Sequence, residues 1–87
     1  MMTEQQINAV LADIFFDVFL REDIVISRTL SARDVEDWDS FKQIEIVMAS
    51  EAAFAVKFTS RELDNLRNLG DLIEIIASRG SLPASPN

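Results

Sequence analysis

The sequence predicts a small all-α domain of four helices, with a long loop between the first two and a short third helix. Apolar residues recur at the three- and four-residue spacing of a helix face, and residues that favour helix N-caps precede several of these runs. The chain has 87 residues, enough for one domain with one core. This size favours a binding or carrier module over an enzyme with a deep catalytic cleft.

The first helix is expected over residues 3–20. Its apolar residues recur at the spacing of one helical face and form a broad stripe, made of Ile7, Val10, Leu11, Ile14, Phe15, Val18 and Phe19. Asp13 and Asp17 fall outside this stripe and are expected on a solvated face.

Residues 22–37 show no sustained period and are expected to form a long loop. Scattered apolar residues, among them Ile24, Leu30 and Val35, would pin this loop to the core. A loop of this length is uncommon in a small domain unless it contains a short turn of helix or has a function.

The second helix is expected to begin at Ser40, with Asp39 as its N-cap, and to end near Ala53 or Phe54. A helix N-terminus offers unpaired N–H groups and the positive end of the peptide dipoles, so it stabilises a phosphate held there. The Ser40 hydroxyl is therefore well placed to carry a covalent phosphate.

The last two helices are predicted from their N-caps. Thr59 and Glu62 have the spacing of a capping box, which opens a helix of one or two turns. Asn68 is the expected cap of a fourth helix that ends at Gly80. The domain is thus expected at residues 1–80, and residues 81–87, which contain two prolines, are expected to form a flexible tail.

Composition excludes several classes of function. The net charge of −7 argues against nucleic acid and anionic lipid as partners and favours basic protein surfaces. The chain has neither cysteine nor histidine, which removes most zinc sites and the usual pairs of nucleophile and base. No metal site and no catalytic residue are predicted.

The first residues show neither a basic region nor an uninterrupted apolar segment, so no signal peptide is predicted. The most apolar stretch, residues 9–20, is far too short to cross a bilayer. We expect a discrete, monomeric protein of the cytoplasm that does not associate with membranes.

The second helix carries two apolar faces, whereas a small domain needs only one for its core. One face contains Phe41, Ile44 and Met48, flanked by Glu45 and Glu51. The other contains Ile46, Val47 and Phe54, with Ser50 among them. The surplus face predicts a protein partner, unless the long loop buries it.

Residues 38–58 read W-D-S-F-K-Q-I-E-I-V-M-A-S-E-A-A-F-A-V-K-F and resemble acyl carrier proteins. In that family the second helix begins D-S-L, continues with alternating apolar and acidic residues, and ends in an E-x-x-F-type element. Residues 69–73, L-G-D-L-I, are similar to the V-G-D-L that opens the family's last helix. The resemblance covers nearly the whole chain.

The resemblance implies a carrier of acyl groups. Ser40 would hold a covalent 4′-phosphopantetheine arm, added from coenzyme A by a phosphopantetheinyl transferase that uses magnesium, and Asp39 would contact that transferase or its metal. The arm would present acyl groups, as thioesters, to acyl-loading and acyl-transfer enzymes with basic docking surfaces. The residues implied in recognising these partners are Trp38, Phe41, Ile44, Glu45, Met48 and Glu51, and those implied in lining an acyl pocket are Ile46, Val47, Ser50 and Phe54.

Three departures from the family pattern favour a specialised lipid or polyketide-type pathway. Asp37-Trp38 replaces the usual Gly-x before D-S, and Phe41 replaces leucine. Lys42 stands where an acidic residue is usual, which makes the recognition surface less negative. Ser50 replaces an inward leucine, and our hypothesis is that it changes the size or polarity of the cargo pocket.

Two other functions compete with this interpretation. An aminoacyl or peptidyl carrier of a nonribosomal system shares the fold and the serine, although it usually has a G-G-x-S motif. A small helical interaction module without a prosthetic group would explain the acidic charge and the surplus apolar face equally well. Trp38 could serve packing alone or lie beside the prosthetic group or a partner.

Overall fold

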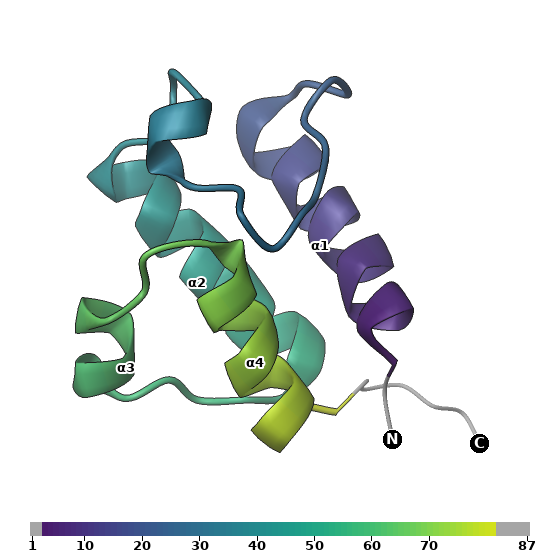
Figure 1. Cartoon of the computed structure of the whole chain (residues 1–87), viewed down its shortest axis with the longest axis vertical. Coiled ribbons are helices and arrows are strands. Elements are labelled where there is room, and N and C mark those ends of the chain that lie inside the picture. Colours follow the sequence, from purple (N-terminus) through teal and green to yellow (C-terminus); the bar gives the residue numbers. More distant parts are fainter. Residues whose placement is uncertain (1–2, 82–87) are drawn as a thin grey trace.

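The computed structural model describes residues 3–81 and is all-helical over that range. Its elements are α1 (Glu4–Phe19), the 3₁₀ turn η1 (Ala32–Asp34), α2 (Ser40–Phe54), α3 (Ser60–Asp64) and α4 (Leu69–Arg79). Figure 1 shows α1 and α2 running in opposite directions, α4 in front of α2, and the short α3 at the edge of the molecule. The predicted fold class and all four predicted helices are confirmed.

Local capping explains where the helices begin. The Thr3 hydroxyl accepts the Gln6 N–H at 3.1 Å while Gln6 Oε1 accepts the Thr3 N–H at 2.9 Å. Thr59 and Glu62 form the predicted capping box in the same way, and the Asn68 side chain accepts the Asp71 N–H at 3.0 Å. These side chains satisfy N–H groups that a helix start leaves unpaired.

The ends of α1 and α2 carry no glycine signal in the sequence. Leu20 and Ala55 close these helices in the left-handed region, with φ of 56° and 53°. The Leu20 N–H reaches the Phe16 carbonyl oxygen at 2.7 Å, as in a left-handed cap. Gly80, predicted to end α4, does so with an ordinary φ of −81°.

The core lies between α1, α2 and α4 and includes five of the seven stripe residues predicted for α1, while Val10 and Val18 are half-buried and pack against it. Sixteen apolar residues are buried there: Ile7, Leu11, Ile14, Phe15, Phe19, Leu30, Val35, Ile46, Val47, Phe54, Val56, Phe58, Leu69, Leu72, Ile73 and Ile76. Among the described residues, Ser50 is the one polar side chain in this buried set. None of the helices in residues 3–81 has the length and hydropathy needed to span a bilayer.

The long loop is held by polar contacts as well as by its apolar residues. Leu30 and Val35 are buried, as predicted, and η1 supplies a short helical turn. The N–H groups of Leu69 and Gly70, at the start of α4, donate to the carbonyl oxygens of Leu30 and Arg28, each at 2.8 Å. The Arg28 guanidinium also pairs with Glu4 on α1 at 2.8 Å and with Glu74 on α4. The predicted flexible tail lies, after Ser81, outside the described residues.

Replacing Gly70 with alanine is expected to destabilise the fold. The new Cβ would lie 2.8 Å from the Arg28 carbonyl oxygen, to which the Gly70 N–H donates, so the loop would have to move. We expect the free energy of unfolding to fall by about 1–3 kcal/mol in urea denaturation. Ser78→Ala, at an exposed position of α4, should change it by less than about 0.5 kcal/mol. A more stable Gly70→Ala protein, the usual outcome within a helix, would contradict the close approach.

Candidate functional site

Ser40 is the first residue of α2, as predicted, and its side chain is exposed. Asp39 precedes it with an extended backbone, and the Asp39 carboxylate accepts the Lys42 N–H at 3.0 Å. No hydrogen bond within residues 3–81 engages the Ser40 hydroxyl. The cap therefore fixes the start of the helix while it leaves the hydroxyl available beside the helix's positive end.

An open cleft of about 570 Å³ begins beside Ser40 and runs between α2 and the α3–α4 segment. Asp39, Ser40 and Gln43 line it from the start of α2. Its other walls are mostly apolar and consist of Ala32, Trp38, Ile44, Ile46, Leu63, Leu66, Leu69 and Leu72, with Arg67 and Asn68. A flexible group attached to Ser40 could therefore lie in an apolar cleft without any change in the core.

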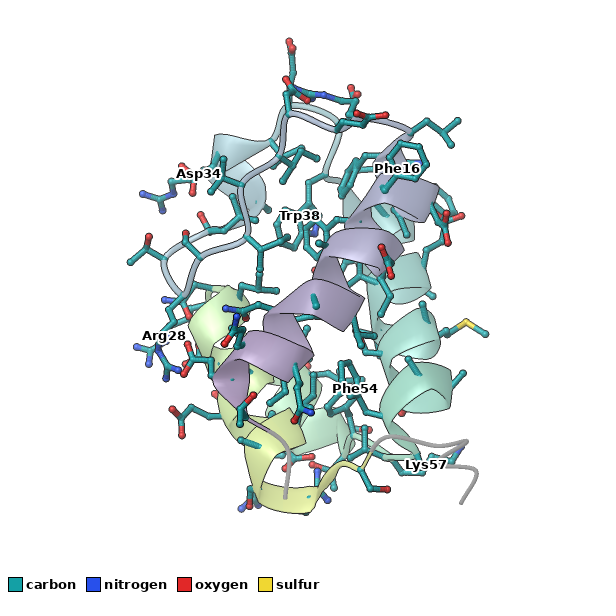
Figure 2. The ribbon with its side chains drawn as sticks, turned by 90° about the vertical axis from the view of Figure 1, so that its right-hand side faces the viewer. Phe16, Arg28, Asp34, Trp38, Phe54 and Lys57 are labelled. Carbon is teal, nitrogen blue, oxygen red and sulfur yellow. The ribbon has the colours of Figure 1, made fainter. Side chains whose placement is uncertain are left out.

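Trp38 anchors the start of α2 from within the molecule. Its ring packs edge-on against Phe15 with centroids 5.3 Å apart and tilted against Phe19 at 6.0 Å. Its indole N–H donates to Gln43 Oε1 at 2.8 Å. Figure 2 shows Trp38 in the upper half of the molecule and Phe54 in the lower half. Trp38 thus packs against the core and also lines the cleft that holds Ser40, whereas its predicted role in partner recognition stays a prediction.

Lys42 connects α2 to the end of α1. Its ammonium group donates to the Val18 carbonyl oxygen at 3.0 Å and lies 3.6 Å from Glu45 Oε1. The last turn of α1 contains no basic residue of its own, so Lys42 supplies the positive charge that a helix C-terminus favours. Sequence reasoning treated this lysine only as a reduction of surface charge.

The outward face of α2 exposes four of the residues predicted to recognise partners. Phe41, Ile44 and Met48 are 78%, 55% and 64% exposed, and Glu45 is exposed beside them. Glu51 differs, because its half-buried carboxylate accepts the Phe58 N–H at 2.9 Å. A smaller groove of about 360 Å³ runs along this face toward α3 and is lined by Gln43, Ile44, Val47, Met48, Glu51 and Leu63.

The inward face of α2 buries all four residues predicted to line an acyl pocket, namely Ile46, Val47, Ser50 and Phe54. They do not share one cavity. Ile46 lines the cleft beside Ser40, Val47 lines the smaller groove, and Ser50 and Phe54 line neither. The remaining walls of the cleft are formed by α3, α4, the segment between them and the loop that precedes α2. None of the cleft-lining residues of α3, of α4 or of the segment between them was among the predicted site residues.

Comparisons with known proteins identify two similar curated proteins. The chain is 30% identical over 77 residues to an acyl carrier protein of Acidothermus cellulolyticus, a match that covers 88% of this chain and 92% of the relative. It is 32% identical over 74 residues to a meromycolate extension acyl carrier protein of Mycolicibacterium smegmatis, covering 85% and 75% of the two chains. No protein-family model matches the sequence.

A solved structure is similar as well. The solution structure of a holo acyl carrier protein from Geobacter metallireducens superimposes with a TM-score of 0.75 at 34% identity, and the match covers 80% of each chain. Sequence and structure thus point to the same family over most of the chain.

Replacing Trp38 with phenylalanine is expected to lower the free energy of unfolding by about 1–2 kcal/mol. The aromatic contact would largely remain, whereas the part-buried Gln43 oxygen would lose its donor. Urea denaturation would measure the loss, which should shrink in a Gln43→Met background where that acceptor is already absent. An equal loss in both backgrounds would assign the effect to ring packing alone.

Proposed function

Because this chain belongs to the acyl carrier protein family, whose members are carriers and not enzymes, we propose that Ser40 bears a 4′-phosphopantetheine arm on which acyl groups are carried. The observation that carries this proposal is the position of Ser40. Its hydroxyl is exposed at the N-terminus of a 15-residue helix and opens onto an apolar cleft. The related solved structure is that of a holo protein, which agrees with a prosthetic group in this family.

The residues around Ser40 fit a phosphate diester. Asp39 takes the Lys42 N–H, and the N–H groups of Ser40 and Phe41, at the very start of the helix, have no carbonyl partner four residues back. These two donors and the helix dipole favour a negative charge at the Ser40 oxygen. The Asp39 carboxylate is also negatively charged, but it accepts the Lys42 N–H and is thereby held in the N-cap position.

In the attachment step the Ser40 oxygen forms a bond to the phosphorus that bears the pantetheine half of coenzyme A. The pyrophosphate bond breaks, the adenosine bisphosphate half leaves, and the serine proton passes to a base of the transferase. Coenzyme A is the donor substrate of that transferase, and magnesium is the metal ion that the transferase uses. Once attached, the arm supplies a terminal thiol that holds an acyl group as a thioester. The chain then raises the effective concentration of its cargo at each partner.

The outward face of α2 suits partners with an apolar groove and basic edges. Phe41, Ile44 and Met48 supply the apolar contact, and Glu45 supplies negative charge beside it. We propose that the transferase and the acyl-handling enzymes dock here, in the cytoplasm, and serve a specialised lipid or polyketide-type pathway. One of the relatives is named for meromycolate extension, which supports the proposal of a dedicated pathway.

The proposal is tested by the intact mass of the purified protein before and after incubation with coenzyme A, magnesium and a broad-specificity transferase. The wild-type protein should gain the mass of one phosphopantetheine, and Ser40→Ala should gain none. Ser60→Ala is the matched control, because Ser60 is also an exposed first residue of a helix, and this variant should be modified like the wild type. No mass gain with several transferases would instead favour an unmodified interaction module.

Reversing the charge of Glu45 should weaken docking of the transferase. We expect Glu45→Lys to raise the KM for the carrier about five- to tenfold with little change in kcat, because the lysine would face basic residues of the partner. Asp13→Lys, an exposed position on α1, makes the same change in net charge and should leave KM nearly unchanged. Equal effects of the two substitutions would show that net charge alone matters and not this surface.

A further inference from the structure

Ser50 is an unusual member of the core. Its exposure is 0%, and its hydroxyl oxygen has no hydrogen-bond partner within the described residues. The other buried side-chain oxygen without a partner belongs to Asn8, a residue that is itself only half-buried. Ser50 is therefore the one fully enclosed residue of this region with an unused polar group.

An unpaired hydroxyl in an apolar core is unfavourable. A serine within a helix commonly donates to a carbonyl oxygen of the preceding turn, but Ser50 makes no such bond here. Its nearest neighbours along the same helix face, Ile46 and Phe54, offer no polar side-chain atom. An alanine or a larger apolar residue would avoid the cost of burying the hydroxyl. A partner supplied by a bound molecule would remove that cost.

Ser50 lies one helical turn beyond a residue that lines the cleft. Ile46 lines the cleft that begins at Ser40 and lies one helical turn before Ser50 on the same face. Ser50 is ten residues after Ser40, or about 15 Å along the helix axis. A chain that enters beside Ser40 and passes Ile46 into the core would next meet the Ser50 hydroxyl.

We propose that the acyl cargo of this carrier bears a hydroxyl or oxo group on its chain, and that Ser50 Oγ hydrogen-bonds to that group when the chain enters the core. This inference rests on the proposed carrier function and specifies the class of its cargo. A serine hydroxyl both donates and accepts, so it serves either oxygen group. The surrounding core residues are apolar and uncharged, which excludes a carboxylate or an ammonium on the buried part of the chain.

The experiment compares saturated decanoyl cargo with decanoyl chains that bear a hydroxyl or oxo group at carbon 3, 5, 7 or 9. Each chain is attached to Ser40 through a non-hydrolysable pantetheine analogue, and loading is verified by intact mass. The readout is the rise in Tm over the protein that carries the arm without cargo. Ser50→Ala removes the hydroxyl, and Ser78→Ala on the exposed face of α4 is the matched control.

In the wild type and in Ser78→Ala, at least one oxygenated chain should raise Tm by about 4–8 °C more than the saturated chain does. In Ser50→Ala this advantage should disappear, and the protein without cargo should melt at the same or a higher temperature than the wild type. The inference is overturned if no oxygenated chain exceeds the saturated one in the wild type, or if the advantage persists in Ser50→Ala. A failure to load Ser40 at all would instead overturn the carrier function, and the inference with it.

Discussion

The site depends on how the first turn of α2 is held against the last turn of α1. Trp38 packs on Phe15 and Phe19 just before α2 begins, and Lys42 reaches from the first turn of α2 to the Val18 carbonyl oxygen. These contacts join an apolar anchor to a charge-assisted hydrogen bond at adjacent helix ends. They keep the helix start in place, although both Asp39 and Ser40 are exposed to solvent.

With its start fixed, α2 separates two tasks by helix geometry alone. Phe41, Ile44 and Met48 point outward and leave apolar surface for a partner. Ile46 and Ser50 point inward and are buried, and we propose that this face meets the tethered chain. The Ser40 hydroxyl, to which we propose the arm is attached, lies at the N-terminus of the same helix. A carrier needs no catalytic group of its own, which agrees with a chain that lacks histidine and cysteine.

The helices could be predicted from the sequence because their signals are local: Asp39, Thr59 and Asn68 cap the turns that follow them, and apolar spacing defines the faces. Features that depend on distant residues could not. Lys42 reaches Val18 across 24 positions of the chain, and Leu66 and Leu72 complete the cleft only once α3 and α4 are in place. The left-handed caps at Leu20 and Ala55 lacked the glycine that usually marks such ends.

The two walls of the cleft differ in how firmly they are held. One wall is α2, a 15-residue helix with four residues in the core, whereas the opposite wall includes α3, a five-residue helix with no buried residue. Within residues 3–81, the ion pair between Arg79 and Glu62 links α3 to α4, while the capping box of Thr59 and Glu62 lies within the first turn of α3 itself. Segments with few buried contacts open at a lower free energy than the core does. The cleft can thus widen at α3 for a longer or bulkier cargo while α2 continues to present the same face to every partner.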